Sequence, residues 1–541
     1  MNAAEEYARY LRLAPEEADA LAAMSEEERE DAFYRSLTFG TAGLRGVMGP
    51  GTNRMNPRVV ARASRGLAAW LRETGAETAV IGYDSRHHSR EYAAVAAAAL
   101  AERGIRVLLF GTLIPTPCVS FAVRETHAGA GVMITASHNP PEYNGYKVYG
   151  PDGGQITDAA ADRIQAAIDR EDLFAPLPDE AEAAGRIAPV PDSLTEDYLR
   201  RVLSCVPAAS DPSPTIVYSP LNGTGRGPVL RALAAAGFGN VRVVPEQEQP
   251  DGDFPTCPKP NPEERTAMEP GIRLAEETGA GLVIATDPDC DRLGAAVRQN
   301  GAFRLLTGNE LGALLLDWLC ARREAAGTLP AKAVAVRSLV STDLADDIAA
   351  AHGVEMRQVL TGFKYIGEQM TALEAEGREE DFLFGFEESC GFLSGTHARD
   401  KDGVNAALAV CAMYADYHAA GLTLTDRLEA LQDAYGRRTH RTISRSFPGE
   451  EGAREMAALM ARLRAAPPEV LCGAPVTECR DYVPGREGLP PADMLELLLA
   501  DGGRVILRPS GTEPKLKLYL TVRAAGPEAE ERIRALEAAL L

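Results

Sequence analysis

A unit of strand, polar loop, helix, glycine and strand occurs three times along this 541-residue chain. The first copy comprises, in order, residues 78–83, 84–86, 90–103, Gly104 and 105–110. Short apolar runs bounded by turn residues indicate buried strands, and a glycine commonly ends a helix. The same order returns at residues 215–244 and 333–359. Because repeats so far apart indicate duplicated domains rather than a solenoid, the pattern predicts three similar α/β domains in tandem.

The last hundred residues follow a different pattern. Strands are expected at 441–447, 476–483, 504–507 and 515–522, and helices at 455–465 and 528–540. This mixture predicts a small C-terminal domain of the α+β class.

Domain boundaries are expected near proline-rich linkers, which lie at residues 176–191, 208–214 and 249–262. Residues 1–36 read as acidic helices in front of the first domain. We therefore expect four domains, at residues 1–205, 206–325, 326–440 and 441–541.

Composition narrows the class of protein. The net charge is −22, and no run of Lys or Arg offers the basic stripe that a nucleic-acid partner would require. Nine scattered cysteines without a CxxC pair indicate reduced thiols in the cytoplasm. No apolar stretch reaches the eighteen or so residues of a membrane span, and the N-terminus lacks the features of a signal peptide. Nothing indicates an obligate protein partner.

The loop at 135–140, TASHNP, follows an apolar run at 130–134. It places the hydroxyl of Ser137 at the end of a strand, where open α/β sheets bind ligands. Such a hydroxyl can act as a nucleophile or phosphate carrier, or it can simply cap the loop.

The loop at 286–292, TDPDCDR, follows another apolar run at 281–285. Asp287, Asp289 and Asp291 can converge because alternate side chains of an extended segment share a face. Three such carboxylates repel one another unless a cation neutralises them, and oxygen ligands suit Mg²⁺. The alternative is a solvated acidic turn, because Asp and Pro are turn formers.

Four further loops carry polar groups suited to a phosphorylated sugar. Glu387 and Ser389 follow a strand expected at 381–384, and Lys401 lies among carboxylates where it can exchange protons. The loop at 507–515, LRPSGTEPK, combines Arg508, hydroxyls and a glycine in a compact phosphate clamp. Arg45 lies in a glycine-rich loop. By contrast, His127, His397 and His440 stand apart from these motifs, and we expect them to be structural.

Together, these loops resemble those of the α-D-phosphohexomutases, the phosphoglucomutase/phosphomannomutase family, and come closest to its phosphoglucomutase branch. TASHNP resembles the family's phosphoserine loop, TDPDCDR its magnesium loop, GFEES its sugar-binding loop and RPSGTEPK its phosphate-binding loop. The four motifs occur in the family's order, and the resemblance as a whole runs from residue 38 to residue 515. The resemblance implies three related α/β domains and a different C-terminal domain around one central cleft.

The resemblance also implies roles for individual residues. Ser137 would carry the phosphate, and its phosphoserine oxygen would join Asp287, Asp289 and Asp291 around Mg²⁺. Substrate would be held by Glu387, Ser389, Arg292, Arg508, Ser510, Gly511 and Thr512. Lys401 would be the general acid/base, a task that His138 or Lys147 could share, and Arg45 would line the same reaction centre.

The implied activity is interconversion of glucose 1-phosphate and glucose 6-phosphate through a bisphosphorylated sugar, with glucose 1,6-bisphosphate as activator. Phe386 stands between Gly385 and Glu387, where many family members read Gly-Glu-x-Ser. Mannose and pentose phosphates therefore remain open as substrates, as does a sugar-bisphosphate synthase on the same scaffold.

Overall fold

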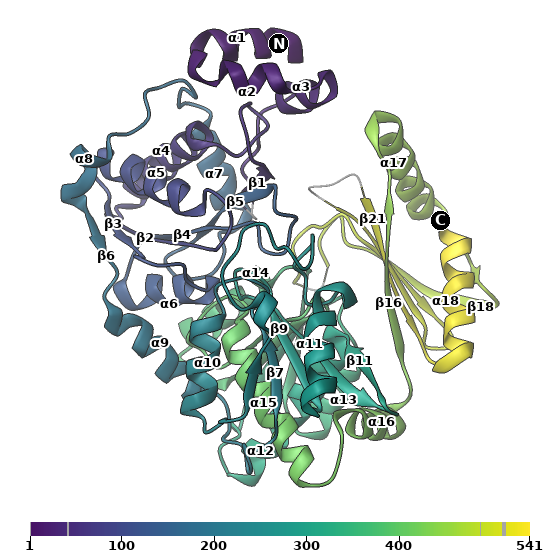
Figure 1. The fold of residues 1–541 in the computed structure, drawn as a ribbon. Coiled ribbons are helices and arrows are strands. Elements are labelled where there is room, and N and C mark those ends of the chain that lie inside the picture. The colour runs from purple at the N-terminus through teal and green to yellow at the C-terminus, as the bar shows by residue number, and fades with distance from the viewer. Residues whose placement is uncertain (1, 41–42, 487, 511–514) are drawn as a thin grey trace.

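A computed structural model describes residues 2–40, 43–486, 488–510 and 515–541 of the protein. This part of the chain forms four β-sheets with helices packed against them (Figure 1). None of its helices is long and apolar enough to cross a membrane. Ahead of the first sheet lie three short helices, as expected from the acidic N-terminal segment: α1 (Ala3–Leu13), α2 (Ala18–Ala23) and α3 (Glu26–Phe33).

The first sheet has the strand order β1-β5-β4-β2-β3-β6. Its strands are β1 (Leu44–Val47), β2 (Thr78–Tyr83), β3 (Arg106–Leu109), β4 (Ala130–Ile134), β5 (Tyr143–Tyr149) and β6 (Ile187–Pro189). Its helices are α4 (Pro57–Thr74), α5 (Ser89–Glu102), α6 (Thr116–Thr126), α7 (Asp158–Ile168) and α8 (Glu180–Ala183). Helices cover both faces: Ala79 and Ile81 pack in one apolar cluster with α4 and α5, and Val80 packs in another with α6.

The second sheet has the order β11-β10-β9-β7-β8. Its strands are β7 (Ile216–Ser219), β8 (Val241–Val243), β9 (Leu282–Thr286), β10 (Leu293–Gln299) and β11 (Ala302–Leu306). The helices of this region are α9 (Asp192–Cys205), α10 (Arg226–Ala235) and α11 (Arg265–Thr278).

The third sheet has the order β13-β12-β14-β15. Its strands are β12 (Val334–Ser338), β13 (Glu355–Val359), β14 (Phe382–Glu387) and β15 (Gly391–Ser394). The helices of this region are α12 (Gly308–Ala325), α13 (Leu344–Ala351), α14 (Phe363–Ala375), α15 (Gly403–Ala419) and α16 (Leu424–Tyr435).

These three sheets share one topology. In each, the predicted strand–helix–strand unit forms a parallel pair, which a third parallel strand and an antiparallel hairpin partner extend. The hairpins are β4–β5, β9–β10 and β14–β15, and their turns contain Ser137, the three aspartates and the Glu388–Ser389 pair, respectively. Each turn has one non-glycine residue in the left-handed region: Ser137 (φ 53°), Cys290 (φ 52°) and Cys390 (φ 60°). Three of the predicted motifs therefore occupy the same place in three copies of one fold.

The fourth sheet is antiparallel, with the order β16-β21-β20-β19-β18-β17. Its strands are β16 (Thr439–Ser446), β17 (Val470–Leu471), β18 (Ala474–Asp481), β19 (Leu495–Leu499), β20 (Arg504–Pro509) and β21 (Lys515–Val522). Two helices accompany it, α17 (Gly449–Ala465) and α18 (Gly526–Leu540). The expected α+β class of this domain is confirmed.

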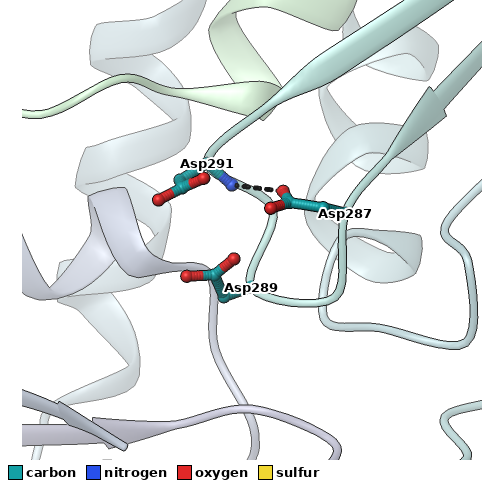
Figure 2. A group of neighbouring side chains, drawn as sticks. All are labelled: Asp287, Asp289 and Asp291. Atoms are coloured by element: carbon teal, nitrogen blue, oxygen red, sulfur yellow. Dashed lines mark hydrogen bonds between the residues drawn. The ribbon is translucent and has the colours of Figure 1, made fainter. Parts of the chain in front are cut away.

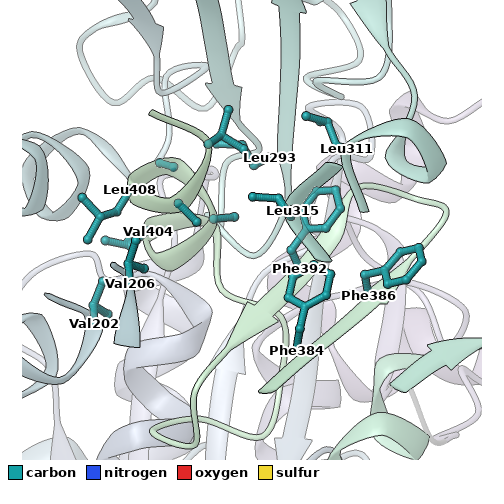
Figure 3. Packing of buried hydrophobic residues seen from close by; sticks show 14 of the residues in the cluster. Val202, Val206, Leu293, Leu311, Leu315, Phe384, Phe386, Phe392, Val404 and Leu408 are labelled. Carbon is teal, nitrogen blue, oxygen red and sulfur yellow. The ribbon is translucent and has the colours of Figure 1, made fainter. Parts of the chain in front are cut away.

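One large apolar cluster unites the first three sheets, running from Val80 to Leu431. Figure 3 shows its middle part, where Phe384, Phe386 and Phe392 of the third sheet lie near Leu311 and Leu315 of α12. Because the three domains share this core, the angles between their sheets are fixed by packing.

The structure corrects three local expectations. Arg45, expected in a glycine-rich loop, lies on strand β1. The strand expected at 381–384 continues to Glu387, because Phe386 points into the shared core and extends the apolar pattern of β14. The proline-rich segment at 176–191 is more than a linker, because its residues 187–189 form the edge strand β6, which pairs with β3. Proline is compatible with that position because an edge strand does not need every N–H.

Candidate active site

Two of the equivalent hairpin turns meet at Ser137. The Ser137 hydroxyl donates a hydrogen bond of 2.7 Å to Oδ2 of Asp287, which lies 150 residues away in the second sheet. Both side chains are buried, and Ser137 is only 3% exposed. The first two domains therefore bring a hydroxyl and a carboxylate into direct contact.

Hydrogen bonds with Arg86 and Thr135 of the same domain hold the Ser137 turn in place. The Ser137 backbone N–H donates to the hydroxyl of Thr135 at 2.8 Å. The buried guanidinium of Arg86 donates to the carbonyl oxygens of Ser137 (2.6 Å), Pro140 (2.8 Å), Tyr143 (3.0 Å) and Asn139. Sequence reasoning treated Arg86 only as part of a polar loop. Its position after β2, the strand beside β4 in a parallel sheet, is the signal that could have marked it.

The three aspartates of the second turn converge. One carboxylate oxygen from each of Asp287, Asp289 and Asp291 lies within 4.8 Å of the other two, and all three side chains are buried. Figure 2 shows them on one tight loop, with the backbone N–H of Asp291 donating to Oδ1 of Asp287 at 3.1 Å. The expected acidic cluster is therefore present, and it is not a solvated turn.

The donor atoms of this cluster fit a metal ion. Oδ1 of Asp289 and Oδ1 of Asp291 are buried and have no hydrogen-bond partner among the described residues, although Nε of Arg292 lies 3.8 Å from Oδ1 of Asp291. A buried carboxylate oxygen without a partner is costly unless a cation lies beside it. The all-oxygen donor set is the kind that hard divalent cations prefer.

Two lysines neutralise part of the acidic charge. Nζ of Lys147 lies 2.7 Å from Oδ2 of Asp289 and 3.1 Å from Oδ2 of Asp291. Nζ of Lys401 lies 2.8 Å from the same oxygen of Asp291 and 3.2 Å from Oδ1 of Asp400. Burial alone would lower the pKa of each lysine, but the surrounding carboxylates outweigh it and raise both pKa values. Both lysine side chains are therefore protonated and positively charged at neutral pH.

The cluster is electrostatically uneven. Burial, together with Asp289 and Asp291, raises the pKa of Asp287 well above its ordinary value. Burial acts in the same direction on Asp291, but Lys147, Lys401 and Arg292 outweigh it and lower the pKa of that carboxyl. Positive charge at the site therefore gathers around Asp291, whereas Asp287 faces the Ser137 hydroxyl.

Three further expected residues contact Ser137 or its neighbours in the two turns. The ring of His138 has Nδ1 3.3 Å from the Ser137 hydroxyl, and burial with the nearby cations Arg292 and Arg45 lowers its pKa well below the usual value. Arg292 donates its backbone N–H to Oδ1 of Asp287 at 2.9 Å. Arg45 donates to the side chain of Asn139 at 3.0 Å.

The end of β14 and the turn after it supply two glutamates with different surroundings, Glu387 and Glu388. Glu387 accepts a 2.8 Å hydrogen bond from the backbone N–H of Gly362, and burial raises its pKa. Glu388 accepts from Ser338 at 3.1 Å, and burial with the neighbouring Glu387 raises its pKa to about 7. Ser389 lies in the turn that follows and is half-buried.

The fourth domain contributes part of the expected phosphate loop. Arg508 lies near the end of β20, and the backbone N–H of Ser510 donates to the carbonyl of Lys515 at 2.8 Å. Gly511 and Thr512 lie outside the described residues. Sequence reasoning missed Lys517 on β21, whose pKa is lowered by burial and by the guanidiniums of Arg508 and Arg292. Lys517 is thus a cation close to Glu388 of the third domain, and alternation along β21 is the only sequence signal for it.

Four domains thus present a hydroxyl, an acidic cluster and several cations to one region, which defines a class of phosphate-handling enzyme with a metal site. The domain models of the phosphoglucomutase/phosphomannomutase family match residues 36–174 (α/β/α domain I), 196–301 (domain II), 307–435 (domain III) and 450–540 (C-terminal domain). The chain belongs to this family.

Curated relatives and solved structures agree with this membership. The chain is 36% identical over 514 residues to a phosphoglucomutase of Staphylococcus aureus, with 92% of each chain covered. It is also 36% identical over 512 residues to a phosphoglucomutase of Staphylococcus epidermidis, again with 92% of each covered. Its fold is similar to a putative phosphomannomutase from Thermus thermophilus (TM-score 0.72, 23% identity, 94% and 99% covered). It is also similar to the open form of parafusin, a phosphoglucomutase, from Paramecium (TM-score 0.69, 18% identity, 94% of each covered).

Proposed function

We propose that this protein is a phosphoglucomutase, an isomerase that interconverts glucose 1-phosphate and glucose 6-phosphate. The observation that carries the proposal is the 2.7 Å contact between the Ser137 hydroxyl and Asp287, beside an acidic cluster in which two buried oxygens accept no hydrogen bond from the described residues. The names of the staphylococcal relatives support glucose phosphate as the substrate. The reaction would take place in a central cleft that the four domains surround.

Ser137 carries the phosphate in this proposal. Phosphoserine 137 gives its phosphoryl group to the free hydroxyl of a sugar monophosphate, and the resulting bisphosphate turns over and returns its other phosphoryl group to Ser137. The rigid turn supports this role, because Arg86 and Thr135 fix the position of the reacting oxygen before substrate binds. The activator that first phosphorylates Ser137 is glucose 1,6-bisphosphate.

Mg²⁺ is the proposed metal, held by Asp287, Asp289, Asp291 and an oxygen of the phosphorylated Ser137. When bound, it would supply positive charge to a phosphoryl group in transfer. The cations Lys147, Arg292 and Arg45 surround the same region and add to this charge.

Proton handling falls to side chains beside the sugar hydroxyl. Lys401 is the proposed general acid/base, because its ammonium lies between Asp291 and Asp400 and can donate a proton. His138 has a lowered pKa and is neutral near pH 7, so it can accept one from the Ser137 side. Lys147 can share the work of Lys401.

Substrate recognition is assigned to the third and fourth domains. Glu387 and Ser389 would bind sugar hydroxyls, and Arg508, Ser510, Gly511 and Thr512 would hold the phosphate that is not being transferred. Half-buried Lys517 interacts electrostatically with both Glu388 and Arg508, and we add it to the phosphate-binding set. The domain division at 1–205, 206–325, 326–440 and 441–541 and a cytoplasmic location remain part of the proposal.

The test is a turnover assay with Mg²⁺ and a trace of glucose 1,6-bisphosphate, comparing glucose 1-phosphate, mannose 1-phosphate and ribose 1-phosphate. A clear preference for glucose 1-phosphate is expected. Preference for mannose or ribose phosphate would make the protein a phosphomannomutase or phosphopentomutase and would place the specificity in the Glu387–Ser389 turn. Turnover that required an acyl-phosphate donor would identify a sugar-bisphosphate synthase instead.

A further inference from the structure

A second constellation of reactive side chains lies outside the site described above. Cys205, the last residue of α9, has its sulfur 3.7 Å from Nδ1 of His397, although 192 residues separate them. The other ring nitrogen of His397 lies 2.8 Å from Oδ2 of Asp402. The His397 side chain is 1% exposed and that of Asp402 is 0% exposed, whereas Cys205 is partly exposed. Two contacts therefore connect a thiol, an imidazole and a carboxylate in that order, and the thiol is nearest to solvent.

This arrangement favours the thiolate. Burial would lower the pKa of His397, but Asp402 and Cys205 outweigh it and raise this pKa to about 9. Burial would likewise raise the pKa of Cys205, yet the hydrogen bond with His397 outweighs it and lowers this pKa. The C-terminus of α9 opposes a negative charge, an effect that is small at a partly exposed position. Arg323 helps to offset it, since its guanidinium donates to the Cys205 carbonyl at 3.0 Å.

The same residues are connected to the loop that carries Lys401. Asp402 follows Lys401 directly and caps α15, accepting from the backbone N–H groups of Val404 (2.8 Å) and Asn405 (3.0 Å). Tyr198 of α9 donates to both oxygens of Asp402 at 2.9 Å. Gly395, in the loop before His397, lies so close to Cys205 that a Cβ added there would be 2.2 Å from the sulfur. An atom added to the sulfur on that side therefore has no space unless the 395–402 loop moves.

We propose that Cys205 is a peroxide-reactive thiol that His397 and Asp402 activate, and that its oxidation displaces the loop carrying Lys401. The thiolate sulfur attacks one oxygen of hydrogen peroxide and the O–O bond breaks. The thiol proton, held by His397, passes to the departing hydroxide, so that thiol and peroxide become sulfenic acid and water. Sulfur loses two electrons and the peroxide gains them. The added oxygen enlarges a side chain whose sulfur is already in close contact with Gly395. Loss of the thiolate charge also weakens the pairing of this sulfur with His397.

Reactivity is tested first in the unmodified protein. The protein is treated with limiting hydrogen peroxide at pH 7 and then with dimedone, and labelled cysteines are located by mass spectrometry of its peptides. Cys472 and Cys479 are internal controls, because both are also partly exposed, and burial raises the pKa of Cys479. Since an ordinary thiol is only a few per cent ionised at pH 7, we expect Cys205 to react at least about tenfold faster than either control. Equal or slower labelling of Cys205 overturns the proposal.

Two variants then distinguish activation of the Cys205 thiol by His397 from simple solvent exposure of Cys205. His397→Gln keeps a hydrogen-bonding side chain but cannot hold a positive charge, and we expect it to slow Cys205 labelling about tenfold while Cys479 is unaffected. Cys205→Ser should abolish the label at this position. An unchanged labelling rate in a folded His397→Gln variant would show that His397 does not activate the thiol. If that variant does not fold, the comparison of the three cysteines in the unmodified protein decides the question alone.

The effect on the Lys401 loop has its own readout, which does not depend on the proposed function. Hydrogen exchange of residues 395–402 should become faster after peroxide treatment of the unmodified protein and stay constant in Cys205→Ser. Where turnover is measurable, peroxide should reduce it in the unmodified protein and not in Cys205→Ser. Unchanged exchange with Cys205 fully oxidised would contradict displacement of the loop, even if no sugar phosphate is turned over.

Discussion

The hydroxyl of Ser137 donates to Asp287 at 2.7 Å across the boundary between the first and second sheets. The two residues lie in equivalent hairpin turns of two copies of the same fold. Duplication thus places two turns of different sequence face to face, one with a hydroxyl that can carry phosphate and one with carboxylates that can hold a metal. The site exists only where the copies meet.

Replacing Ser137 by alanine should abolish turnover without unfolding the protein. The hydroxyl is the proposed acceptor of the phosphoryl group, so no other atom at this position can replace it. Activity should fall to the background of the assay, and incubation with glucose 1,6-bisphosphate should no longer add the mass of one phosphoryl group. Thermal unfolding serves as the control for folding. Near-normal turnover by the folded variant would falsify the assignment of Ser137 as carrier.

Removal of divalent metal by EDTA should silence the enzyme, and Mg²⁺ should restore it. Asp289→Asn is the matched variant, because it removes one carboxylate whose Oδ1 has no partner among the described residues. Metal ions contribute several kcal/mol to charge stabilisation, so we expect a loss of roughly 10²-fold or more in kcat. Mg²⁺ should also raise the unfolding temperature of the unmodified protein more than that of the variant. If chelation leaves turnover unchanged, the aspartates do not hold a required metal.

The sequence predicted the architecture well because the strand–helix–strand units repeat with clear apolar periodicity. It did not reveal that the three motif turns are equivalent hairpins, because each turn has diverged toward different chemistry. The end of β14 was also misplaced: Phe386 packs into the shared core, and only the fold shows that this residue belongs to the strand.

The partners of several site residues could not be predicted from the sequence, because they come from distant segments of the chain. Lys401 meets Asp291 because the β15–α15 loop packs against the β9–β10 turn. His397 meets Cys205 because the same loop also packs against the end of α9. His397 was expected to be structural, and no local pattern relates it to a cysteine 192 residues earlier. The ion-pair partners of Lys147 are equally remote, although its presence in the site was anticipated from family resemblance.

Arg86→Lys should reduce turnover while leaving metal binding intact. Lysine keeps the charge but lacks the guanidinium fork that donates to the carbonyls of Ser137, Asn139, Pro140 and Tyr143. A shift of about 1 Å in the reacting oxygen can cost on the order of 10²-fold in rate. Steady-state kinetics should show the loss in kcat rather than in KM. Arg90→Lys is the control, because Arg90 is exposed on the following helix and should retain normal activity. Equal kinetics for both variants would mean that Arg86 does not position the turn.

The last prediction concerns stability and pH. Burial opposes the charge on His397, but Asp402 and Cys205 raise its pKa in the folded protein to about 9, compared with an ordinary value of 6.5. A raised pKa stabilises the folded state fully below pH 6.5, and this stabilisation is lost as the pH rises through about 9. The difference in pKa corresponds to roughly 3 kcal/mol.

The unmodified protein and His397→Gln should therefore differ most in free energy of unfolding near pH 6 and least near pH 9.5. Denaturant titrations at both values measure this difference. The matched control is His88→Gln, because His88 is exposed and pairs with Glu91 at the surface, where an ion pair contributes little. A gap between the unmodified protein and His397→Gln that stayed constant from pH 6 to pH 9.5 would show that His397 is not held as a cation by Asp402.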